Sequence, residues 1–145
     1  MTRAKRLQAL AESYDGVPAS WDECSIFPAQ WIADERGIEV PWPAYDSEEE
    51  GRALIHEAGG LVHVWEDVAK AIGFPERRDE PVRLGDVGVI RTSRHDQIGG
   101  IFADHGVFIC RSINGTRYLA PKAYEWVRSE AGIGIRPVVL KVWQV

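Results

Sequence analysis

The stretch that decides the fold class is "GDVGVIRTSRHDQIGGIFADHGVFICR", residues 85–111. It contains the short runs VGVI, IGGIFA and GVFICR, which are rich in β-branched and aromatic residues and are separated by turn-forming residues. ADHG, inside the stretch, and SING, just after it, are typical of tight hairpin turns. TRYLAP and RPVVLKVWQV continue the pattern to residue 145. We therefore predict an antiparallel sheet in the second half of the chain, from residue 81 onward.

The first half of the chain has helical periodicity instead. Apolar residues recur at helical spacing in the segments 2–14, 20–32, 47–60 and 61–74. Ser47 is followed by three glutamates, an arrangement that caps a helix and complements its dipole. The second helix starts either at Asp22 or after Ser25, because Pro28 is tolerated best in a first turn. Helices followed by an antiparallel sheet predict an α+β fold.

Composition narrows the class of protein. With 145 residues, 45% of them hydrophobic and 27% charged, residues 1–145 fit a single globular domain that can bury its own core. A net charge of -5 argues against nucleic-acid binding. No apolar run approaches the ~20 residues that span a bilayer, so we expect no membrane span and synthesis in a cytoplasm. The cysteines lie in no metal-binding or disulfide pattern, and we expect no metal and no other cofactor.

Cys24 is the first candidate for chemistry. In "SWDECSIFPAQWI", residues 20–32, it stands at the start of a helix, where backbone N–H groups and the helix dipole lower a thiol pKa. Asp22 and Glu23 oppose this effect, since nearby negative charge raises a thiol pKa. Cys24 also shares a helical stripe with Phe27 and Trp31. It is therefore either an activated nucleophile or a small apolar core residue, and the second interpretation is favoured.

The order of these parts resembles the NlpC-type, papain-like cell-wall peptidases. In that family a cysteine begins a helix, a Gly-Asp segment opens the first strand, and the next strand supplies a histidine. The corresponding segments here are 23–25, 85–87 and 98–102. The resemblance implies a papain-like NlpC-type fold, with N-terminal helices packed on a C-terminal antiparallel sheet. It also implies Cys24 as the nucleophile of any cysteine peptidase activity.

A closer resemblance covers nearly the whole chain. The sequence is similar to a group of small proteins encoded among phage tail genes, which look like truncated NlpC-type domains. Four motifs carry this likeness: Cys24, Phe27, Ala29 and Trp31 in a helix; Gly59, Gly60 and Leu61 at a helix start; Gly85, Asp86 and Val87 at a strand; and Trp143, Gln144 and Val145 as the last residues. The resemblance implies a tail component, located in the virion tail after assembly and in the host cytoplasm when synthesised.

The catalytic histidine of the peptidases is missing from its expected position. Ile98 occupies that position, or Gln97 if the alignment shifts by one, and neither can accept a proton. His95, three residues away, could serve as an unusually placed base if its loop folded back. His105 should lie at a far hairpin tip, roughly 20 Å away. His56 and His63 are expected to be solvated or to lie at the edge of the core.

The remaining candidates concern packing and contact with partners. Trp42, in a proline-stiffened loop, either contacts another protein or packs over the domain's own helices. The apolar ending with Trp143 and Val145 either closes the sheet or pairs with a neighbour's edge. Asp86 either orients a catalytic group or forms a turn, and Cys110 is expected in the core.

The function we predict is a non-catalytic, structural or assembly component of a phage tail or phage-derived particle, located at the tail tip. Its expected partners are other phage tail proteins, with a peptidoglycan peptide as a further candidate. One alternative is a cysteine peptidase or amidase that acts on peptidoglycan stem peptides through Cys24 and His95. Another is a cytoplasmic binding or immunity-type protein unrelated to tails. The sequence alone leaves these alternatives open, because a fold does not fix a function.

Overall fold

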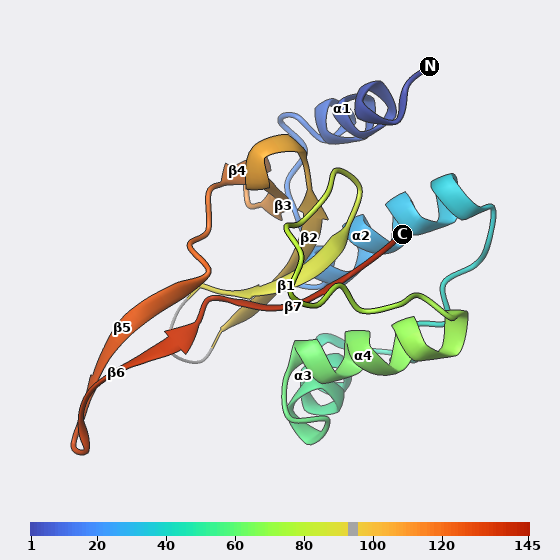
Figure 1. Cartoon of the computed structure of the whole chain (residues 1–145). Helices are drawn as coiled ribbons and strands as arrows, with labels where there is room; N and C mark the ends of the chain where they lie inside the picture. The colour runs from blue at the N-terminus through green and yellow to red at the C-terminus, as the bar shows by residue number, and fades with distance from the viewer. Residues whose placement is uncertain (93–95) are drawn as a thin grey trace.

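The computed structural model describes residues 1–92 and 96–145 and has the α+β architecture expected from the sequence (Figure 1). The helices come first in the chain and pack on an antiparallel sheet built by the second half. The helices are α1 (Arg3–Ser13), α2 (Glu23–Arg36), α3 (Glu48–Glu57) and α4 (Leu61–Ile72). The strands are β1 (Val87–Arg91), β2 (Gln97–Phe102), β3 (Phe108–Ser112), β4 (Gly115–Leu119), β5 (Tyr124–Ser129), β6 (Gly132–Pro137) and β7 (Val139–Trp143), with a short 3-10 turn η1 (Asp104–Gly106) between β2 and β3.

Local signals account for the helix ends. The Ser47 hydroxyl accepts a hydrogen bond from the Glu50 N–H (3.1 Å), which caps α3 as the sequence predicts. Gly73 ends α4 in the left-handed conformation, with φ 79°. Helix α2 begins directly after Asp22, so the earlier of its two predicted starts is correct and Pro28 lies inside the helix. The Pro28 ring nitrogen cannot donate to the carbonyl one turn before it, which is that of Cys24.

The main sheet has the strand order β4-β3-β2-β1-β7, and the pairs are antiparallel. Helices α2 and α4 lie against the central strands, and α2 makes most of its sheet contacts with β2 and β3 (Figure 1). The core between helices and sheet contains Phe27, Trp31, Trp65, Val89 and Ile101 among its buried members. This layer positions the start of α2 directly over β2.

The opposite face of the sheet carries a second, smaller core. Its buried members are Ile90, Phe102, Phe108, Cys110 and Val142. Because side chains alternate between the two faces of a strand, these residues are one position out of step with those that face the helices. Cys110 therefore lies in the core, as the sequence predicts, and burial raises its pKa to about 11.

Strands β5 and β6 form a separate two-stranded sheet that projects from the rest of the molecule (Figure 1). The sequence prediction missed β5 and merged residues 136–137, the end of β6, with the final strand. The final strand β7 starts at Val139 and pairs with β1. Within residues 1–92 and 96–145, no helix has the length and apolar character needed to cross a bilayer.

Candidate functional site

Cys24 is the second residue of α2, and its side chain is half-buried where the helix meets β2. The backbones approach closely at this point: a Cβ added to Gly99 would lie 2.3 Å from the Cys24 carbonyl oxygen. That carbonyl lacks a helical donor because residue 28 is proline. Glycine at position 99 is thus what allows β2 to pass under the first turn of α2. The sequence analysis did not single out Gly99, although a paired glycine inside a strand signals close approach.

Burial is the main influence on the Cys24 thiol and raises its pKa. Hydrogen bonding from the Gly99 backbone and from the Ser25 side chain lowers the pKa, but by less, and the charge of Asp22 raises it further. The thiol therefore remains protonated at neutral pH, and the activating effect of the helix start does not prevail. This environment suits a packed cysteine better than a nucleophile, which reacts as the thiolate.

Strand β2 corresponds to the strand expected to carry the general base, but the residue that it turns toward α2 is not Ile98. Ile98 packs in the second core, on the face of the sheet that points away from α2. The expectation that Ile98 faces the thiol is therefore wrong, because an alignment that slips by one residue moves a side chain to the other face. Gln97, the shifted alternative, shares the helix-facing side with Gly99 and Ile101.

Gln97 is engaged in holding the start of α4. Its Oε1 accepts a hydrogen bond from the Val62 N–H (2.8 Å). The N-cap residue of α4 is Gly60, which has no side chain to satisfy the first N–H groups of the helix. The Gln97 side chain, on the helix-facing side of β2, supplies this cap. The position nearest to that of the peptidase histidine thus has a structural task.

The described histidines lie away from the thiol's immediate surroundings. His56, His63 and His105 are exposed, the last of them in η1, beyond the far end of β2. Within the part of the chain that the structure describes, no histidine contributes to the pKa shift of Cys24. His95, the alternative base predicted from the sequence, lies outside the described residues.

Polar side chains around the start of α2 are paired with structural partners. The Tyr45 hydroxyl and the Ser20 hydroxyl each donate to the Asp22 carboxylate, both at 2.7 Å. Burial and the Asp22 charge raise the Tyr45 pKa well above its usual range. Glu23 lies 3.5 Å from the guanidinium of Arg111, whose side chain is 1% exposed and also donates to the Gly115 carbonyl oxygen (2.6 Å). These contacts join the helix start to the sheet.

Asp86 is also part of the framework. Its carboxylate is 3% exposed and receives two hydrogen bonds from Arg77, at 2.5 and 3.1 Å, and one from the Arg83 N–H at 2.8 Å. The turn interpretation of Gly85-Asp86 is the one that this geometry supports. The pair joins the segment before the sheet to the start of β1.

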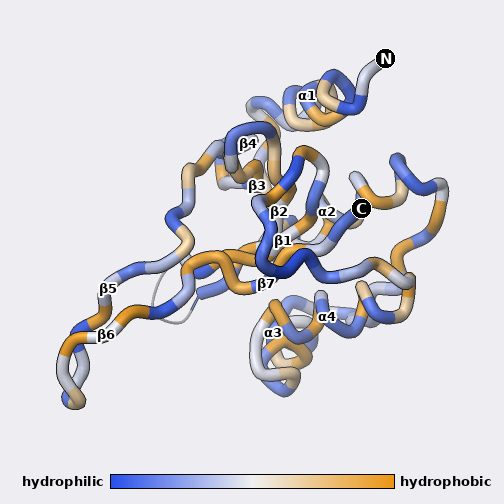
Figure 2. The backbone as a smooth tube through the Cα atoms, in the orientation of Figure 1, coloured by the Kyte–Doolittle hydropathy of each residue, from blue (hydrophilic) through white to orange (hydrophobic). Residues whose placement is uncertain are grey.

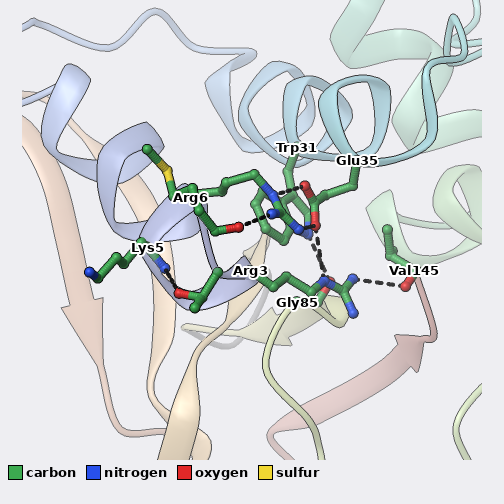
Figure 3. A network of polar contacts seen from close by, with 9 residues as sticks. Arg3, Lys5, Arg6, Trp31, Glu35, Gly85 and Val145 are labelled. Carbon is green, nitrogen blue, oxygen red and sulfur yellow. Dashed lines mark hydrogen bonds and ion pairs between the residues drawn. The ribbon is translucent and has the colours of Figure 1, made fainter.

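Two of the predicted interface candidates are buried within the chain itself. Trp143 is 3% exposed and Val145 is 7% exposed, and both belong to the core under the helices. The Val145 carbonyl oxygen accepts a hydrogen bond from Arg3 (2.8 Å), which also pairs with Glu35 (Figure 3). The terminal segment therefore closes the sheet, which was one of the two alternatives. Beyond β7, the Gln144 N–H donates to the Pro75 carbonyl oxygen (2.9 Å).

Trp42, the third candidate, packs on the chain's own core. Its ring centroid lies 4.9 Å from that of Trp65 in α4, and its side chain is partly buried. The most exposed tryptophan is instead Trp126 in β5, at 78%, which the sequence analysis did not select. Alternation of Tyr124 and Trp126 with polar residues was the signal that could have found it.

Fold and site together define an α+β domain with a protonated, half-buried cysteine at the start of a helix that packs on an antiparallel sheet. The family model described as "Domain of unknown function (DUF6950)" matches residues 1–143. The chain belongs to this family. A comparison with curated proteins finds no match.

Proposed function

We propose that the chain is a non-catalytic structural or assembly component of a phage tail, or of a phage-derived particle, and acts at the tail tip. It uses a degenerate NlpC-type, papain-like fold as a module that binds other tail proteins. The motif order described above supports this proposal, from the Cys24 helix to the Gly85-Asp86 strand. The protein would be made in the host cytoplasm and reside in the tail after assembly.

The observation that carries the non-catalytic part is the contact between α2 and β2. At Gly99 the strand lies against the Cys24 backbone, and Gln97 on the same face is bound to α4. A thiol with a raised pKa depends on a general base, whose assistance contributes about 10² to 10⁴ in rate. Neither Gly99 nor Gln97 has a side chain that can act as a general base.

Peptidoglycan digestion tests the chemistry. Purified protein and its Cys24→Ala and His95→Ala variants are incubated with peptidoglycan fragments, and released stem peptides are measured by mass spectrometry. We expect no release above a no-protein control from any of the three. Release by the unmodified protein that disappears in both variants would establish the cysteine peptidase alternative and overturn the proposal.

Gene deletion in a phage that carries this chain tests the tail assignment. We expect tailless or tip-defective particles by electron microscopy, and full rescue by a copy that encodes Cys24→Ala. Rescue by this variant separates a structural role from a catalytic one, because it lacks the only thiol on α2. Normal, infectious particles after deletion would contradict a role in the tail.

A further inference from the structure

The β5–β6 hairpin presents one face that is almost entirely apolar and exposed. Cross-strand pairing defines this face, from the base of the hairpin to its tip, as the pairs Tyr124/Pro137, Trp126/Ile135 and Arg128/Ile133. We call these six residues the hairpin face. Tyr124, Trp126, Ile133 and Ile135 are 60%, 78%, 68% and 61% exposed. Hydrophobic segments extend along the hairpin well beyond the helices and the main sheet (Figure 2).

An uncovered apolar face leaves an isolated hairpin with little to stabilise it. A two-stranded sheet is marginally stable in water without a layer packed on it. The hairpin strands pack mainly against each other. The opposite side of the ribbon is mostly polar or small, with an ion pair between Glu125 and Arg136 (2.5 Å), glycine at positions 132 and 134, and one apolar side chain, the half-buried Val127. The hairpin therefore has one apolar face, and that face lacks a covering layer within the described residues.

The exposed area matches what a symmetric dimer needs. At full side-chain areas of roughly 180 to 250 Å², the exposed fractions of the four large apolar residues correspond to about 550 Å². This is near the upper end of the largest apolar patches found on monomers, about 300 to 600 Å². Two such faces packed together would bury at most about 1,100 Å², close to the roughly 1,000 Å² expected of a specific interface.

The two ends of the hairpin face carry a cation and an aromatic ring. Arg128 is exposed near the tip. At the base, the ring of Tyr124 is exposed beside a groove whose charged residues are of both signs. A twofold axis through the central pair Trp126/Ile135 would lay the tip of one hairpin on the base of the other. Each Arg128 would then approach the ring of Tyr124 in the partner, which favours a cation–π contact.

We propose that two copies of this chain associate through the hairpin face, packed face to face about a twofold axis. The two ribbons form a small sandwich whose centre is the Trp126/Ile135 pair of each copy. Apolar burial supplies the affinity, and the Arg128 contacts fix the antiparallel orientation of the two hairpins. This proposal is independent of the function proposed above, because it concerns self-association and not the identity of any other partner.

The test measures the mass of the protein in solution by sedimentation equilibrium and light scattering across 1 to 200 µM. We expect the unmodified protein to be a dimer at the upper concentrations, and Trp126→Glu and Ile135→Glu to be monomers throughout. Arg128→Glu should weaken the dimer about tenfold at low salt and less at 1 M salt, because the lost contact is electrostatic. Tryptophan emission should shift to shorter wavelength as the dimer forms, because Trp126 is the most exposed of the six tryptophans.

Ile113→Glu is the matched control, since Ile113 is 79% exposed in the turn between β3 and β4 and lies outside the hairpin face. We expect it to dimerise like the unmodified protein. Circular dichroism of each variant checks that the fold is retained. A protein that is monomeric at 200 µM would overturn the proposal and assign the face to a different protein. A dimer that persists in Trp126→Glu would overturn it as well, because the contact would then lie elsewhere.

Discussion

Substitution of Gly99 by alanine tests the central contact of the candidate site. The added Cβ would lie 2.3 Å from the Cys24 carbonyl oxygen, which is backbone and can move only if α2 moves. Overpacking of a core costs about 1 to 3 kcal/mol and sometimes more. Since the obstacle here is a helix and not a flexible side chain, we expect about 3 kcal/mol or more. For a chain of this size, that lowers the melting temperature by roughly 10 °C.

Gly134→Ala is the control for this experiment, because a Cβ at Gly134 meets nothing within 4 Å. We expect its free energy of unfolding to stay within about 0.5 kcal/mol of that of the unmodified protein. Urea unfolding and thermal melting of both variants give the comparison. Equal stability of the Gly99 and Gly134 variants would refute the argument that α2 rests directly on β2, and with it the reason for a closed site at Cys24.

Three further predictions concern the thiol, the buried ion pair and the terminal strand. Because burial raises the Cys24 pKa, alkylation of Cys24 at pH 7 should be slower than that of a model thiol. The rate should increase as the pH rises above the usual thiol range. A reaction faster than that of the model thiol at pH 7 would show an activated thiolate. Asp86→Asn should cost on the order of 3 kcal/mol in urea unfolding, since it removes the buried charge partner of the Arg77 guanidinium and leaves only the 54% exposed Glu80. Glu80→Gln should change stability by less than about 1 kcal/mol. Deletion of residues 143–145 removes two buried apolar side chains and should cost at least about 3 to 5 kcal/mol or make the protein insoluble, so an unchanged melting temperature would count against an integral terminal strand.

Features set by local sequence could be predicted well. Ser47 with the following glutamates specifies a helix start through contacts within a few residues, and this prediction is confirmed. Gly73 ends α4 through contacts that are equally local. The hairpin connections around η1 and before β4 are local in the same sense. The α+β class follows from these elements, because helices and an antiparallel sheet in this order pack as two layers.

Features set by distant contacts could not be predicted. The side of β2 on which Ile98 lies depends on how the strand is seated against α2, and a motif alignment does not fix that parity to within one residue. The role of Gln97 depends on a helix 35 residues earlier in the chain. For Trp42 the sequence left packing and a partner contact both open, because Trp65 is brought to it only by the packing of α4; the structure shows the packing alternative.

The hairpin was missed for a different reason. Its strands alternate exposed apolar residues with polar or glycine residues, and they contribute nothing to either buried core. Strand prediction relies on the assumption that an apolar face is covered by the same chain. Where that assumption fails, the pattern of residues 124–137 is easily read as a loop leading into the final strand.

The route of the chain through the hairpin has a consequence for how relatives of this protein can diverge. The hairpin begins after Ala123 and ends before Val138, and the Val138 N–H donates to the Ala123 carbonyl oxygen (2.9 Å). Val138 in turn accepts a hydrogen bond from the Arg91 N–H of β1 (2.7 Å). The two ends of the hairpin therefore meet at one point, so the residues between them can be shortened, lengthened or exchanged without rerouting any strand of the main sheet. Related proteins can therefore differ in the surface of the β5–β6 hairpin while the helices and the main sheet stay the same.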